Sequence, residues 1–169
     1  MARNIEIKAR IYNMDEMLIR VSGLADHGPI EIIQDDAFFN CPMGRLKLRV
    51  LSPAEGQLIF YKRSDSSGPK ESFYEISPTA SPESMMEVLT LAYGQAGRVR
   101  KHRTLFMKGR TRIHIDRVEG LGDFLELEVV LAEGENHEAA KAEADGLIKR
   151  LGISNEQLVE GSYVDLFGS

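Results

Sequence analysis

The chain has 169 residues, of which 43% are hydrophobic and 28% charged, a composition that excludes a wholly disordered protein. Its net charge of −5 gives no overall attraction for nucleic acid, and no apolar run reaches the roughly 20 residues that span a membrane. The single cysteine, Cys41, excludes an intramolecular disulfide. The amino-terminal residues are charged and contain no apolar signal segment, so we expect one cytoplasmic domain over residues 1–169.

In the first half of the chain, apolar and charged residues alternate with the period of two that is typical of strands. Strict alternation over residues 4–10 places on one face Asn4, Glu6, Lys8 and Arg10. A helix is predicted next, from Asp15 as its N-cap to Leu24, which buries Leu18 together with Val21 or Ile19. Turn-forming segments at 52–56 and 63–69 separate further predicted strands at residues 31–39, 45–50, 57–63 and 72–76.

In the second half, a helix is predicted from Ser81 as N-cap, with an apolar stripe of Met85, Val88, Leu89 and Ala92. Strands are predicted at residues 99–106, 112–116, 124–129 and 162–167. Between the last two, residues 137–151 have helical period, with an apolar stripe of Ala140, Ala144, Leu147, Ile148 and Leu151. Gly152 is the expected stop of this helix. The pattern therefore gives eight or nine strands and three helices whose apolar stripes need a sheet face to cover.

The strand faces separate into a basic and an acidic set, with apolar residues on the opposite faces. The basic set comprises Lys8, Arg45, Lys47, Arg49, Lys101, Arg103 and Arg112. The acidic set comprises Glu6, Asp116, Glu126 and Glu128. Two interpretations stay open: the charges belong to the solvated face of an antiparallel sheet, or they line the lumen of a closed barrel. In such a lumen the cations hold a polyanion, and the carboxylates bind a hard divalent metal through oxygen, as phosphoryl chemistry requires.

The ordered set of motifs resembles that of the CYTH superfamily, the triphosphate tunnel metalloenzymes. Asn4-Ile5-Glu6-Ile7-Lys8 is similar to the E-x-E-x-K signature of that superfamily. The resemblance continues through residues 34–39, 44–49, 61–63, 99–103, 112–116, 120–128 and 163–166. Each motif alone is weak, but together they span almost the whole chain, and they look most like the branch labelled class IV adenylyl cyclase.

This resemblance implies an α+β fold in which an eight-stranded antiparallel β-barrel, the triphosphate tunnel, is flanked by helices, often in a homodimer. It implies that the tunnel binds ATP or another triphosphate or polyphosphate, with Mg²⁺ or Mn²⁺ as the metal cofactor. The implied triphosphate-binding residues are Lys8, Arg45, Lys47, Arg63, Lys101 and Arg103. The implied metal ligands are Glu6, Asp116, Glu126 and Glu128. Catalytic roles fall on Lys8, Arg103 and Asp116.

Three positions leave alternatives within this resemblance. Lys62 is the alternative to Arg63, because the parity of that strand is ambiguous. For His114, hydrogen bonding by a neutral imidazole is favoured over metal ligation, since oxygen ligands suit Mg²⁺ and Mn²⁺ better. Asn4 stands where the signature has its first Glu, and an amide oxygen brings no charge to a metal. Whether the site holds one metal or two therefore stays open.

Three functions are compatible with such a site. A cyclase converts ATP to cyclic AMP and pyrophosphate, and the branch that the motifs resemble favours this activity. A triphosphatase hydrolyses tripolyphosphate, a nucleoside triphosphate or thiamine triphosphate. The chain has no Trp to stack a thiamine ring, although Phe and Tyr residues remain available. In the third alternative the tunnel binds a polyphosphate or nucleotide without turnover.

Overall fold

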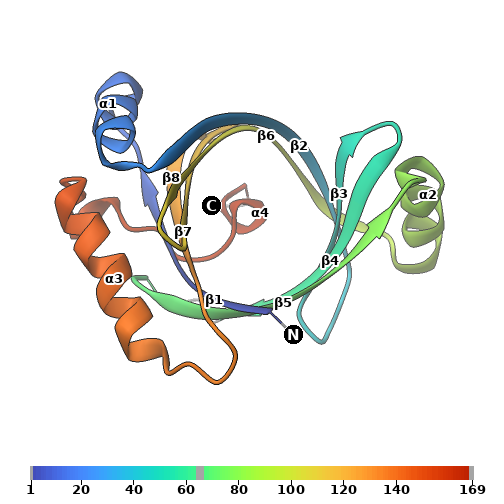
Figure 1. Cartoon of the computed structure of the whole chain (residues 1–169). Coiled ribbons are helices and arrows are strands. Elements are labelled where there is room, and N and C mark those ends of the chain that lie inside the picture. The colour runs from blue at the N-terminus through green and yellow to red at the C-terminus, as the bar shows by residue number, and fades with distance from the viewer. Residues whose placement is uncertain (1, 64–66, 168–169) are drawn as a thin grey trace.

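The computed structural model describes residues 2–63 and 67–167, and these form a closed barrel of eight antiparallel strands with the longer helices on its outside (Figure 1). The strands are β1 (Ala2–Arg10), β2 (His27–Phe39), β3 (Arg45–Ser52), β4 (Glu55–Arg63), β5 (Lys70–Thr79), β6 (Gln95–Lys108), β7 (Thr111–Val118) and β8 (Gly122–Val130). Around the barrel they follow the order β1-β5-β4-β3-β2-β6-β7-β8. The predicted fold class is thus confirmed. Residues 64–66, within one predicted turn, lie outside the described part of the chain.

The barrel closes because β1 pairs with β5 on one edge and with β8 on the other. The strand period then divides β1 between two environments. Ile5, Ile7 and Ala9 point outward into an apolar layer, and the intervening polar residues point inward. The usual arrangement of an apolar barrel interior is therefore reversed here, and the main core lies between the barrel wall and the helices.

Helices α1 (Met14–Leu24) and α3 (His137–Arg150) cover the wall formed by β1, β6, β7 and β8. The predicted stripe of α3 is confirmed, since its five apolar residues are all buried. Gly152 follows α3 with a φ of +68°, which suits its predicted role as the stop. In α1 the predicted cap is wrong: Asn13, not Asp15, accepts a hydrogen bond from the Glu16 backbone N–H. Val21 is buried as predicted.

Helix α2 (Pro82–Tyr93) lies on the opposite side of the barrel, over β2, β3 and β4. Leu89 is buried against the barrel there, with Met85 and Met86 packed beside it. Val88 is 64% exposed and Ala92 is exposed as well, so the predicted stripe is wrong at these two residues. The apolar contact runs through the two methionines instead. Ile19 of α1 is likewise exposed, and Met17 takes its place in the core.

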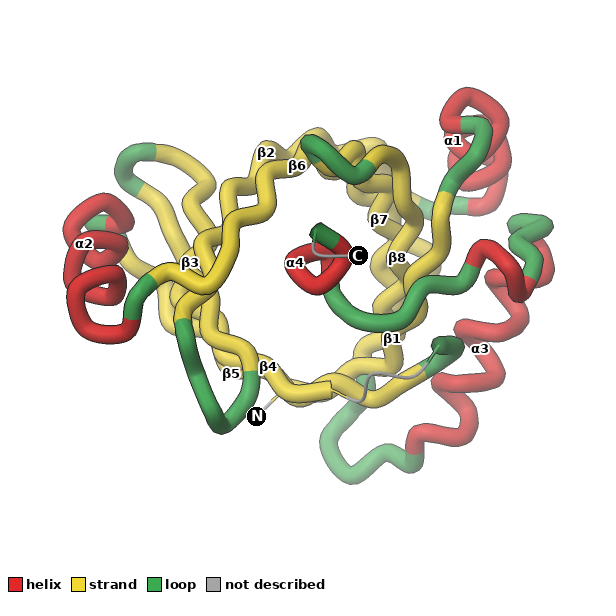
Figure 2. Tube along the Cα trace, turned by 180° about the vertical axis from the view of Figure 1, so that it is seen from behind, coloured by secondary structure: helices red, strands yellow, loops and turns green. Residues whose placement is uncertain are grey.

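The predicted strand at residues 162–167 is wrong, because this segment forms the short helix α4 (Tyr163–Leu166). A capping box starts it: the Ser162 N–H donates to the Asp165 carboxylate, as does the Ser162 hydroxyl. The chain reaches α4 from α3 through the single 3₁₀ turn Asn155–Gln157. Figure 2 shows α4 within the ring of strands at one end of the barrel. Among the described residues, no helix has the length and apolar character needed to cross a membrane.

Candidate active site in the barrel

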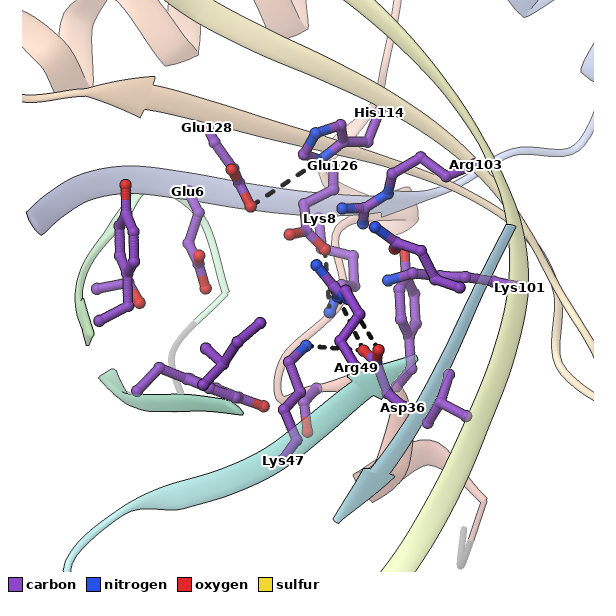
Figure 3. Close-up of a pocket in the computed structure, with 18 of the residues that line it drawn as sticks. Glu6, Lys8, Asp36, Lys47, Arg49, Lys101, Arg103, His114, Glu126 and Glu128 are labelled. Carbon is purple, nitrogen blue, oxygen red and sulfur yellow. Dashed lines mark hydrogen bonds and ion pairs between the residues drawn. The ribbon is translucent and has the colours of Figure 1, made fainter. Parts of the chain in front are cut away.

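The barrel encloses a cavity of about 320 Å³ whose walls are densely charged (Figure 3). Among the described lining residues, the cations are Lys8, Lys47, Arg49, Arg63, Lys101, Arg103 and Arg112. The carboxylates are Glu6, Asp36, Glu126 and Glu128. This volume lies in the range of small-molecule sites, and the excess of cations suits an anionic ligand. The alternative of a merely solvated sheet face is therefore set aside.

One wall of the cavity is acidic and is formed by β1 and β8. Glu6 lies directly opposite Glu128 in the strand register. Glu126 precedes Glu128 by two residues and therefore lies on the same face of β8. Burial raises the pKa of Glu6, and Glu126 and Glu128 raise it further, although the ion pair with Arg63 opposes them. A divalent cation among these carboxylates would relieve their repulsion.

His114 of β7 completes this wall, although sequence reasoning did not count it among the site residues. Ligand atoms of His114, Glu126 and Glu128 all lie within 4.8 Å of one another. Desolvation lowers the pKa of His114 to about 4, so its imidazole is neutral at pH 7. Asn4 lines the same cavity, and its buried Oδ1 accepts no hydrogen bond from the described residues. His114 Nδ1 is likewise buried without a hydrogen-bond partner among the described residues. The carboxylates, Asn4 Oδ1 and His114 Nδ1 together fit a divalent metal ion.

The facing wall is basic and contains an acidic residue that sequence reasoning missed. Asp36 of β2 accepts hydrogen bonds from Lys47 Nζ at 2.8 Å and from Arg49 Nε and Nη2 at 2.8 Å. Although burial opposes ionisation, these cations hold the pKa of Asp36 well below its usual range. Asp36 is two residues from Gln34 and from Phe38 on β2, so all three share the strand face that lines the cavity. This spacing was the signal for Asp36 that the sequence contains. Asp36 fixes two cations at the cavity surface.

Asp116 is buried behind this wall and does not line the cavity. Arg103 donates to it through Nε and Nη2, both at 2.7 Å. Tyr163 of α4 donates its hydroxyl to Asp116 Oδ2, also at 2.7 Å. Despite the burial of Asp116, Arg103 and Lys101 strongly lower its pKa. Because both its oxygens are engaged, this geometry suits a residue that positions Arg103 better than a metal ligand.

Lys8 and Lys101 stand between the acidic wall and α4. Lys8 Nζ lies 3.5 Å from Glu126 Oε2 and 4.0 Å from the centre of the Tyr163 ring. Lys101 Nζ lies 4.8 Å from the same ring centre. Burial, together with the positive charge of Arg103, lowers the pKa of Lys101 to about 7. This amine therefore changes its charge near neutral pH.

The two candidate residues at the end of β4 point in different directions. Arg63 points into the cavity and pairs with Glu6, whereas Lys62 is exposed. The inward residue of this pair is thus Arg63. Arg45 does not line the main cavity: it pairs with Asp165 of α4 and lines a second cavity that shares Arg63 with the first. Of the six predicted triphosphate-binding residues, the cavity brings together all except Arg45.

Comparisons with known proteins agree with this architecture. The family model of the CYTH domain matches residues 2–163. Adenylate cyclase CyaB of Aeromonas hydrophila is 26% identical over 168 residues, which cover 94% of this chain and 85% of that protein. The PH1012 protein of Pyrococcus horikoshii has a similar structure, with a TM-score of 0.83, 25% identity and coverage of 96% and 98% of the two chains.

A similar fold also occurs in HpAC1 from Hippeastrum, with a TM-score of 0.70 at 18% identity and coverage of 98% of this chain and 95% of that one. At this identity the likeness concerns the fold alone. The family match, in contrast, spans nearly the whole chain and includes every strand of the barrel. The chain therefore belongs to the CYTH domain family.

Proposed function

We propose that this protein is a metal-dependent enzyme that acts on a triphosphate bound in the barrel, and that its reaction converts ATP to cyclic AMP and pyrophosphate. The observation that carries the proposal is the opposition of two walls in one cavity. Carboxylates of β1 and β8 face lysines and arginines of β3 and β6 across it (Figure 3). Metal and cations around one polyanion are what phosphoryl transfer needs, since positioning and charge stabilisation do most of the work.

The basic wall supplies the phosphate contacts in this proposal. Lys47, Lys101 and Arg103 neutralise the phosphate oxygens, and Lys8 reaches them from the side of the acidic wall. Arg103 still has three N–H donors after it has made its two bonds to Asp116. Because Asp116 holds the guanidinium in a single orientation, these donors are pre-organised for the anion. Lys8 and Arg103 are thus the proposed catalytic side chains that touch the substrate, and Asp116 positions Arg103.

The acidic wall would hold the metal ion, Mg²⁺ or Mn²⁺, through Glu6, Glu126 and Glu128. When bound, such an ion supplies a Lewis acid that stabilises the negative charge on the phosphates. The residues of the two walls would hold the ion and the polyanion together in one cavity lined by buried side chains, where electrostatic interactions are stronger than in water.

The cyclase assignment rests on the walls near the end of the barrel away from α4. There the lining includes Ile32, Tyr74 and Ile76, which offer apolar and aromatic surface for a nucleobase. In the reaction the ribose 3′-oxygen attacks the α-phosphorus and its proton is released to the solvent, the bond to the bridging oxygen breaks, and pyrophosphate leaves. The similarity to the Aeromonas hydrophila protein named adenylate cyclase supports this choice.

Triphosphatase activity is the second candidate. The structure of HpAC1 from Hippeastrum is described as revealing a dominant triphosphatase activity, and its fold is similar to that of this chain. Water then attacks the terminal phosphorus, the bond to the bridging oxygen breaks, the diphosphate part of the substrate leaves, and the terminal phosphoryl group becomes orthophosphate. The same basic wall serves both reactions, so the direction in which the triphosphate lies decides between them.

The test is a product assay over ATP, GTP, thiamine triphosphate and tripolyphosphate, each with Mg²⁺ and with Mn²⁺. The proposal expects cyclic AMP and pyrophosphate in equal amounts from ATP. Orthophosphate as the main product would establish the triphosphatase instead. Binding of these compounds without any product would reduce the protein to a binding module.

A further inference from the structure

His114 has the burial of a core residue but not the hydrogen bonds of one. Its side chain is 6% exposed, and its Nδ1 has no hydrogen-bond partner among the described residues. Glu128 Oε1 lies 3.9 Å from Nδ1, which is too far for a hydrogen bond. A buried nitrogen without a partner destabilises a fold, so its presence at this position calls for a ligand.

The surroundings of His114 indicate what that ligand is. A ring nitrogen of His114 and carboxylate oxygens of Glu126 and Glu128 lie within 4.8 Å of one another. Atoms that bind one metal ion at about 2.0–2.3 Å lie at most about 4.6 Å apart, so small side-chain movements suffice to bring all three onto one ion. Arg112 Nε donates a hydrogen bond to Glu128 Oε2 at 2.8 Å. The other carboxylate oxygen, Oε1, faces the imidazole and lies 3.9 Å from His114 Nδ1.

We propose that His114 binds the metal ion of this site through nitrogen, together with Glu126 and Glu128, and thereby favours a divalent transition-metal ion over Mg²⁺. The inference deepens the proposed function and rests on it. Mg²⁺ prefers an octahedron of oxygen ligands, whereas imidazole is a good ligand for first-row transition metals. Asn4, which lines the same cavity, offers only a neutral oxygen. Fewer charged oxygen ligands are therefore available than if residue 4 were a glutamate, and the nitrogen of His114 contributes a larger share of the metal affinity.

The direct test is pulsed electron paramagnetic resonance of Mn²⁺ bound to the full-length protein, in which electron spin echo modulation reports nitrogen bound to the metal. Mn²⁺ is added below one equivalent, with tripolyphosphate in place of ATP so that the substrate contributes no nitrogen. We expect ¹⁴N modulation in the unlabelled protein and its replacement by the ¹⁵N pattern in protein labelled only in histidine. This comparison needs no substitution, so it does not depend on the folding of a variant.

The His102→Gln variant is the matched control, because His102 lies on the outer face of the barrel and is 53% exposed. Its nitrogen signal should equal that of the parent, and the signal should disappear in His114→Gln. By calorimetry, His114→Gln should weaken Mn²⁺ binding by about tenfold or more and Mg²⁺ binding by much less.

Bound Mn²⁺ without nitrogen modulation, at an affinity that still depends on Glu126, would overturn the role of His114 and leave the proposed function standing. An unchanged Mn²⁺ affinity in His114→Gln would likewise overturn it. Absence of Mn²⁺ binding in the parent protein would overturn both the nitrogen ligand and the metal-dependent function.

Discussion

Glu126 and Glu128 lie two residues apart on one face of β8, so their charges repel each other, although Lys8 lies near Glu126 and Arg112 pairs with Glu128. Such a pair serves function at a cost in stability. We predict that Glu128→Gln lowers metal-dependent turnover by at least about 100-fold, because one charged ligand is lost. The measurement is the initial rate against metal concentration. Glu119→Gln, at an exposed residue after β7, is the control and should keep the parent rate. Full activity of Glu128→Gln with Mg²⁺ would remove Glu128 from the metal site.

Arg103 is fixed by two hydrogen bonds to Asp116, which a lysine cannot reproduce. We predict that Arg103→Lys weakens tripolyphosphate binding by about tenfold although the charge is kept. Calorimetry at constant salt concentration measures the dissociation constant. Arg100→Lys changes an exposed residue on the outer face of the same strand and should have no effect. Equal constants for Arg103→Lys and the parent would show that the guanidinium makes no directed contact with the phosphates.

Lys101 gives the site a dependence on pH with a defined sign. Its pKa of about 7 in the free protein leaves the amine mostly neutral at pH 8. A bound polyanion favours the charged form, so binding at pH 8 should take up protons, and affinity should fall as the pH rises above 7. Calorimetry in buffers of different ionisation enthalpy measures this uptake. Lys101→Arg, which stays charged, should take up fewer protons with the same ligand. If the two proteins took up equal numbers, another group would be responsible.

At the scale of single residues, the sequence indicated most of the cavity lining but not its pairing. Strand parity placed Glu6, Lys8, Lys101 and Arg103 on faces that proved to be internal. Parity could not show that Asp116 turns toward Arg103 and away from the cavity, because this depends on which strands are neighbours. The preference of Mg²⁺ and Mn²⁺ for oxygen ligands favours a hydrogen-bonding role for His114 when only the sequence is considered. Its unpaired nitrogen becomes visible only once β7 and β8 are side by side.

Among the elements, α4 links the end of the chain to the cavity. Its Tyr163 ring lies against Lys8 and Lys101, and its hydroxyl bonds to Asp116. The alternation of residues 162–167 favoured a strand, but the Ser-x-x-Asp spacing of Ser162 and Asp165 was a signal for a helix start. The eight true strands could be predicted because each contains an apolar and β-prone run between turn formers, most regularly in residues 4–10, whereas α4 has a single turn, which is too short to show a helical period.

We predict that Tyr163→Phe lowers the free energy of unfolding by about 1.5–3 kcal/mol, because a buried hydrogen bond to a carboxylate is lost while the ring remains. Urea unfolding followed by circular dichroism measures the change. Tyr93→Phe, at an exposed residue that ends α2, should alter this free energy by less than about 0.5 kcal/mol. Should both variants unfold like the parent, the contact between α4 and Asp116 would contribute nothing to stability.

At the scale of the whole molecule, closure of the barrel is what turns two charged strand faces into one site. Periodicity alone left an open sheet and a closed barrel as alternatives, and the ordered family motifs favoured the barrel. The pairing of β1 with both β5 and β8 joins segments more than 60 and 110 residues apart in the chain, which no local pattern encodes. With that pairing, acidic and basic walls from distant segments face each other across one cavity.

The most direct test of this account is a crystal structure of the protein with Mn²⁺ and tripolyphosphate, with data collected at the manganese absorption edge. The account predicts an anomalous peak inside the barrel between Glu126 and Glu128, and phosphate density beside Lys101 and Arg103. Tripolyphosphate bound on the outer face beside Arg98 and Arg100, with neither metal nor phosphate inside the barrel, would contradict it.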